Sequence, residues 1–149
     1  MTAADDAHGH DAHDHGGHVH LSHVPDASRP AVFAARAGLV FDPPAHPDQV
    51  EDDLVRFFAA LSKELAGAGC TLVGHIKGTI AIDGARDGLA FHATALGTPP
   101  ALTGGLSGAV RAATLTINVI VFGVDEQALA ALGQDAWSGT TGAVTTWLH

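Results

Sequence analysis

Histidines dominate the first residues of the chain. Seven of the eleven histidines lie between residues 8 and 23, two or three positions apart, among Asp, Gly, Ala and Val. Imidazole is a ligand of zinc, nickel and cobalt, and these spacings let a flexible chain bring several imidazoles to one ion. Neighbouring aspartates add negative charge or oxygen ligands. The predicted metal ligands are His8, His10, His13, His15, His18, His20 and His23.

The composition of this histidine-rich segment also predicts its physical state. Only Val19 and Leu21 could be buried, so the segment cannot repay the entropy of ordering, and we expect residues 1–24 to be a disordered tail. Two alternatives to metal binding stay open. A purification tag would normally be a run of consecutive histidines, which this segment is not, and a solvated tail would have no binding role. The sequence favours a capacity for divalent transition metal, without fixing which of Zn, Ni or Co is bound.

Two further histidines lie in a predicted β-hairpin between Cys70 and Gly97. Apolar and polar residues alternate over residues 72–82 and 89–96, and the DGARDG sequence between these runs contains two Asp-Gly pairs suited to a turn. Matching the apolar faces predicts pairs such as Ile80 with Phe91. In that register His75 lies four residues from the position opposite His92, so their backbones are ~13 Å apart at ~3.4 Å per residue. We therefore expect neither histidine to share an ion with the other.

The sequence contains no recognisable catalytic motif. Gly74-His75-Ile76-Lys77-Gly78 lacks the spacing and the following helix of a phosphate-binding loop, and no GxSxG sequence is present. Cys70 has no histidine partner nearby and is expected to be a small packed residue. We therefore expect no catalytic residue and no enzymatic activity.

Composition restricts the partners and the compartment. A net charge of −9 with only seven scattered Lys and Arg residues argues against nucleic acid. No apolar run approaches the ~20 residues that span a bilayer, so no membrane partner is expected. A single cysteine and the lack of a targeting segment at the start indicate the cytoplasm.

The remaining patterns predict one α+β domain over residues 36–149, preceded by a linker over 25–35. We expect a first strand over 36–41, ended by Asp42-Pro43-Pro44, and an amphipathic helix over 47–65, with His46 a linker or cap residue. A short helix over 106–112, a strand over 114–122 with apolar side chains on both faces, and a helix over 126–136 capped by Asp125 follow. This order predicts a two-layer, ferredoxin-like sandwich, with a mainly antiparallel sheet and helices on one face.

Three segments resemble the C-terminal domain of the CobW family of metal-handling GTPases. HGHDAHDHGGHVH resembles the His-rich linker before that domain, GHIKGTIAI resembles its Arg-x-Lys-Gly strand motif, and INVIVFGVDEQALAAL resembles its last strand, turn and helix. His75 stands where Arg is usual, and the GTPase domain and its Cys-rich metal motif are missing. The resemblance implies a stand-alone metallochaperone or accessory protein that handles metal and has a GTPase or metalloenzyme partner. The alternative is an interaction module that docks such a partner while the tail is incidental.

Overall fold

A computed structural model describes residues 26–148 of the chain, and these residues form an α+β sandwich of two layers. The fold class predicted from the sequence is thereby confirmed. The elements in order are β1 (Pro30–Ala45), α1 (Pro47–Gly67), β2 (Leu72–Ala81), β3 (Gly88–Ala93), β4 (Ala101–Gly104), β5 (Val110–Phe122), α2 (Glu126–Ser138) and β6 (Val144–Leu148).

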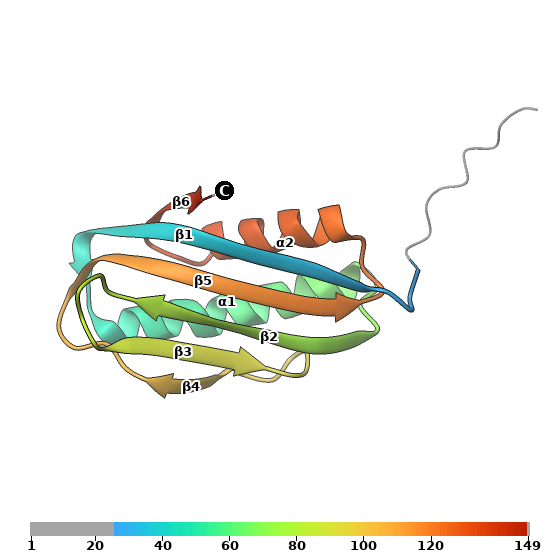
Figure 1. Ribbon diagram of the computed structural model, residues 1–149, viewed down its shortest axis with the longest axis horizontal. Coiled ribbons are helices and arrows are strands. Elements are labelled where there is room, and N and C mark those ends of the chain that lie inside the picture. Colours follow the sequence, from blue (N-terminus) through green and yellow to red (C-terminus); the bar gives the residue numbers. More distant parts are fainter. Residues whose placement is uncertain (1–25, 149) are drawn as a thin grey trace, which may run out of the picture.

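The six strands form one sheet in the order β4-β3-β2-β5-β1-β6, and every neighbouring pair is antiparallel. Both helices lie on the same side of this sheet, so no helix of the described residues covers its other side (Figure 1). Without β3 and β4 the element order would be β-α-β-β-α-β, the order that defines the ferredoxin-like pattern.

The described part of the chain begins with a tight turn. The Asp26 carboxylate accepts hydrogen bonds from the Ser28 hydroxyl (2.6 Å) and backbone N–H (2.9 Å), and these bonds lower the pKa of Asp26.

Strand β1 begins at Pro30 and continues to Ala45 through the cis Asp42–Pro43 peptide bond. The predicted linker over 25–35 and the predicted strand end at Asp42 were therefore wrong. β1 is longer than predicted at both ends because its pairing with β5 continues from Pro30 to Ala45.

Helix α1 agrees with its prediction. The helix begins after His46, whose Nδ1 accepts a hydrogen bond from the Asp48 N–H (3.3 Å), so His46 is a cap residue. Its apolar side chains are buried against the sheet. Asp53 is the one buried acid of this helix; its carboxylate accepts hydrogen bonds from Arg56 and from the Gly142 N–H (3.2 Å). Asp53 thereby ties α1 to the segment before β6.

The core lies between the sheet and the two helices. Alternate residues of the central strands point into it, and they include Leu115, Ile117, Val119 and Val121 of β5, each at most 2% exposed. Aromatic rings join the two helices to each other and to the sheet: the ring centroids of Phe57 and Trp137 are 5.4 Å apart, and those of Phe58 and Phe91 are 5.6 Å apart. The inward side chains of these strands are therefore all buried in a single core between the sheet and the helices.

The β2–β3 hairpin forms as predicted, but in a different register. Ile80 pairs with Leu89 and Ile76 with Ala93, which is a shift of two residues from the predicted pairs. The shift arises because the turn already begins at Ile82, whose carbonyl accepts from the Ala85 N–H at 3.1 Å. A shift of two keeps the same side chains on each face, so the alternation pattern alone could not distinguish the two registers.

The segment after the hairpin departs from its prediction. Residues 101–104, for which no helix or strand was predicted, form the edge strand β4, and the helix expected over 106–112 is absent because β5 begins at Val110. Pairing with β3 and β1 supplies the backbone partners that local sequence preference did not reveal. Helix α2 agrees with its prediction, and Asp125 caps it by accepting from the N–H groups of Gln127 and Ala128.

The packing of α2 on β1 gives a test of this fold. A Cβ added at Gly133 would lie 2.6 Å from Cε1 of Phe33, whereas a Cβ at Gly67, the last residue of α1, meets nothing within 4 Å. We expect Gly133→Ala to lower the free energy of unfolding by about 1–3 kcal/mol through overpacking. The matched change Gly67→Ala should be neutral or raise it by up to ~1 kcal/mol, since Ala favours a helix over Gly. Urea denaturation measures both, and equal effects would contradict the packing described.

Candidate functional site

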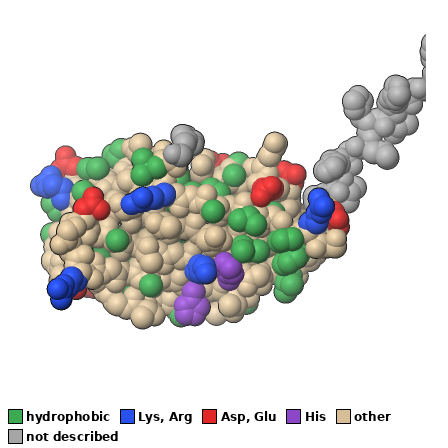
Figure 2. Space-filling view, in the orientation of Figure 1, with side chains coloured by type: hydrophobic (Ala, Val, Ile, Leu, Met, Phe, Trp, Pro, Cys, Tyr) green, Lys and Arg blue, Asp and Glu red, His purple; other side chains and the backbone are tan. Residues whose placement is uncertain are grey.

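The side of the sheet opposite the helices, here called the open face, carries the most concentrated polar chemistry of the described domain. Register places His92, Lys77 and Asn118 side by side on β3, β2 and β5. One step further along the strands, Thr79 lies beside Thr116. Figure 2 views this face and shows two imidazoles close together beside a basic side chain.

These residues surround a shallow hollow of about 640 Å³, here called the polar hollow. Its lining consists of Lys77, Gly78, Thr79, Ala90, Phe91, His92, Thr116 and Asn118. Gly78 is needed beneath it, because a Cβ there would collide with the Phe91 ring and with the Thr116 carbonyl. The absence of a side chain at Gly78 lets three strands and a buried ring approach closely under the hollow. The polar hollow is thus part of the sheet itself and does not depend on a loop.

A second depression, of about 470 Å³, lies between α1 and the segment after β3. Its lining is mainly apolar and includes Val55 and Leu96, with Ser62, Lys63 and Thr98 as the polar side chains. Fewer polar groups converge there than in the polar hollow. The open face is therefore the better candidate for a binding site.

The corrected register changes the relation between His75 and His92. His75 follows the same alternation as Lys77 and lies opposite Ile120 on the open face, while His92 lies opposite Lys77. His75 and His92 are consequently diagonal neighbours, a relation that typically separates Cα atoms by ~7–8 Å. The predicted separation of ~13 Å was wrong. At this separation the two imidazoles are near enough to contact the same group.

Two buried polar atoms of the open face have no hydrogen-bond partner. They are Nε2 of His75 and Oδ1 of Asn118, and they are the two such side-chain atoms found among residues 26–148. Buried polar atoms in native proteins are normally paired, because an orphaned one costs about 1–3 kcal/mol. Their occurrence on one face marks it as a place where a polar group from elsewhere would be stabilised.

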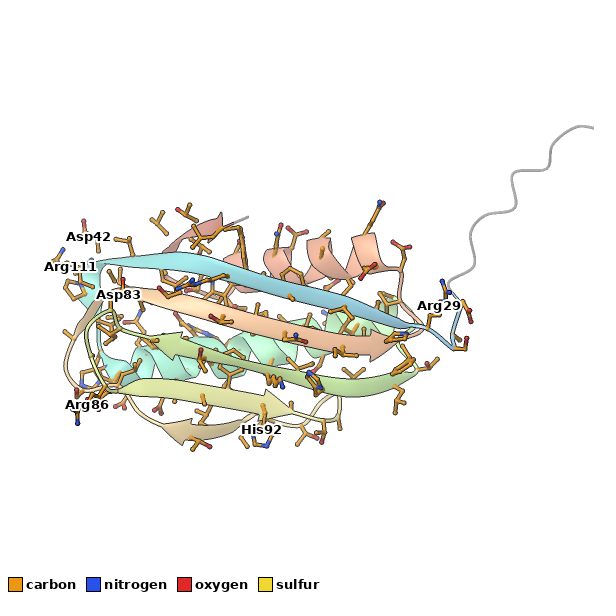
Figure 3. All side chains as sticks on the ribbon, in the orientation of Figure 1. Arg29, Asp42, Asp83, Arg86, His92 and Arg111 are labelled. Atoms are coloured by element: carbon orange, nitrogen blue, oxygen red, sulfur yellow. The ribbon has the colours of Figure 1, made fainter. Side chains whose placement is uncertain are left out.

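Charge is distributed unequally between the two layers. In the described range, Asp42 is the one carboxylate residue located in a strand, and it lies at the end of the sheet with Arg111 (Figure 3). The middle of the open face carries Arg36 and Lys77. The helices and their caps carry most of the other acids: Asp48, Glu51, Asp52, Asp53, Glu64, Asp125, Glu126 and Asp135. The open face is therefore the side of this acidic protein that would attract a carboxylate.

The predicted metal ligands between His8 and His23 lie outside the described residues. Within residues 26–148 no group of three or more His, Cys, Asp or Glu side chains could hold a metal ion. Cys70 is a free, half-buried residue that packs against the core. No helix in the same range is both long and apolar enough to cross a membrane.

Sequence reasoning missed Arg36, Thr116 and Asn118. The segment 114–122 was predicted to be apolar on both faces, whereas Thr114, Thr116 and Asn118 all lie on the open face. Their alternation with buried residues was present in the sequence and could have revealed this face. Arg36 was missed because β1 was expected to begin only there.

The comparisons with known proteins give no relative. No protein-family model matches the chain, and no curated protein or solved structure shows significant similarity to it. The resemblance to the CobW C-terminal domain therefore stays a prediction.

The orphaned Asn118 amide gives a test of the site. We expect Asn118→Val to raise the free energy of unfolding by about 1 kcal/mol, because it removes a buried unpaired acceptor and places a β-branched residue in a strand. Thr116→Val, on the same strand and face, is the matched control and should change stability little. Urea denaturation measures both. A loss of stability confined to Asn118→Val would show that its amide makes a stabilising contact, contrary to the structure.

Proposed function

We propose that the protein is a transition-metal-binding accessory protein that buffers or delivers metal through its N-terminal histidines. The observation that carries this proposal is the cluster of seven histidines within residues 8–23 of the sequence. The lack of a three-residue ligand group within residues 26–148 supports assigning the capacity to this segment and away from the domain. Zn, Ni and Co all suit imidazole ligands, so each is a candidate cargo.

The resemblance to the CobW C-terminal domain supports the same proposal. The GHIKGTIAI sequence covers residues 74–82, most of which belong to β2, and INVIVFGVDEQALAAL extends from β5 into α2. These two segments thus lie in the sheet and in the helix that packs on it. By this resemblance we propose a cytoplasmic GTPase or metalloenzyme as the protein that receives or supplies the ion.

Replacing the seven histidines tests metal binding in the full chain. Calorimetric titration with Ni²⁺, Co²⁺ and Zn²⁺ should show that Ala at positions 8, 10, 13, 15, 18, 20 and 23 abolishes most binding. The apo protein should keep its melting temperature, because the described core is formed by residues 31–137. His46→Asn, which retains a capping side chain outside the segment, is the matched control and should bind like the wild type.

Acid should release the bound metal in the same titrations. Ligand imidazoles must be neutral, and an unperturbed histidine has a pKa of ~6.5, so binding at pH 7.5 should be lost near pH 5.5 as protons compete. Full metal stoichiometry in the seven-alanine variant would contradict the proposal. A loss of the fold in that variant would equally show that the segment is not a separable metal-binding tail.

A second candidate function is docking of a separate GTPase or metalloenzyme on the open face. The observation that favours it is a sheet surface that no helix covers and that holds the polar hollow (Figures 1 and 2). Here the histidines would be incidental. This function and metal binding are compatible within one chain.

A photo-crosslinking amino acid distinguishes this second function. Placed in cells at Thr79, on the open face, it should capture a GTPase or metalloenzyme. Placed at Lys63, exposed on α1, it should not capture that protein. Equal capture from both positions would contradict docking on the sheet.

A further inference from the structure

The open face has two chemically different parts along its length. Near the start of β1, the register sets Leu72 beside Phe122, and Val32 beside Ile120. Leu72 is 60% exposed and Val32 is 37% exposed, so this end is apolar. Further along the strands lie Lys77 and Arg36, which make the middle of the face basic.

The sequence of the N-terminal segment, residues 1–25, has aliphatic and acidic residues in the order that corresponds to the apolar and basic parts of the open face. Its larger aliphatic residues next to the domain are Val19, Leu21 and Val24, whereas the aspartates lie further from it, at positions 5, 6, 11 and 14. The segment has no Lys or Arg. Laid along the open face from β1 onward, its aliphatic residues would meet the apolar end and its carboxylates the basic middle.

The chain is long enough for this placement. Strands are ~4.8 Å apart and rise ~3.3 Å per residue, so Lys77 lies ~20 Å from Pro30, across β5 and five residues along β2. The residues between Asp14 and Pro30 span up to ~50 Å when extended, which is ample. Tethering also raises the effective concentration of the segment to the millimolar range, so weak contacts suffice.

We propose that the open face is a docking surface for the chain's own residues 1–25, with Lys77 and Arg36 holding the aspartates. The exposed imidazole of His92, next to Lys77, offers a further hydrogen bond to the segment. The docking needs no metal ion, so a failure of this proposal and a failure of the proposed metal binding can be distinguished.

Paramagnetic broadening in the metal-free full chain tests the proposal. A nitroxide at Ala12→Cys, in a Cys70→Ser background, should reduce the amide signals of Thr79 and Thr116 on the open face. The signals of Ala59 and Lys63 on α1 should keep their intensity. A nitroxide on the N-terminal amine of the unmodified chain is a second label that leaves Cys70 in place.

Charge variants show whether the stated residues hold the segment. Lys77→Glu or Arg36→Glu should restore most of the lost signal, and so should about 1 M salt, where the screening length is ~3 Å. Lys63→Glu makes the same charge change on the exposed surface of α1 and should leave the broadening unchanged.

Three results would overturn the proposal. Open-face signals of full intensity would show that the segment does not dock and that the face is free for another partner. Equal broadening of α1 and the sheet would show contact without a preferred face. Broadening of unlabelled ¹⁵N protein mixed with spin-labelled protein would place the segment on a second copy instead of its own domain.

Discussion

The burial of one face of the β1–β5 pair is the constraint on which the rest of the structure depends. These two strands are the longest of the sheet and neither is an edge strand, and their inward residues, such as Leu39 and Val119, are almost completely buried. The helices supply the other half of this core through side chains such as Phe57 and Trp137. Because both helices are needed on the same side, no helix or strand of residues 26–148 is left to cover the other side. The open face is thus a consequence of how the core is built.

A sheet with one buried face determines which side chains can do chemistry. Period-2 alternation sends Leu115, Ile117 and Val119 inward and therefore sends Thr116 and Asn118 outward. The same rule places Lys77 outward on β2, with Gly78 beneath the hollow. Continued alternation along β2 sends His75 to the same side, next to the imidazole contributed by His92. The polar hollow follows from strand geometry, so the sheet sets the positions of the residues that line it.

The sequence predicted what depends on local pattern and missed what depends on pairing. The periodicity of α1 and the cap at Asp125 are local, and both were confirmed. Residues 101–104 have little strand character of their own, and their conformation is fixed only by pairing with β3. The hairpin register failed for a related reason, because a two-residue shift preserves the face of every side chain. The wrong register mattered most at the candidate site, because it predicted too large a distance between His75 and His92.

The histidine-rich segment and the polar hollow differ in what the sequence alone can establish about them. Metal binding by the segment requires only a local density of imidazoles, so composition is sufficient to predict it. The hollow requires three strands in a defined register, so only the folded structure reveals it. The two unpaired atoms of the open face, one in the hollow and one beside it, lower stability without contributing to the core. Buried polar groups kept at such a cost are typical of surfaces that are completed by binding. The open face is for this reason a better candidate binding surface than the apolar depression beside α1.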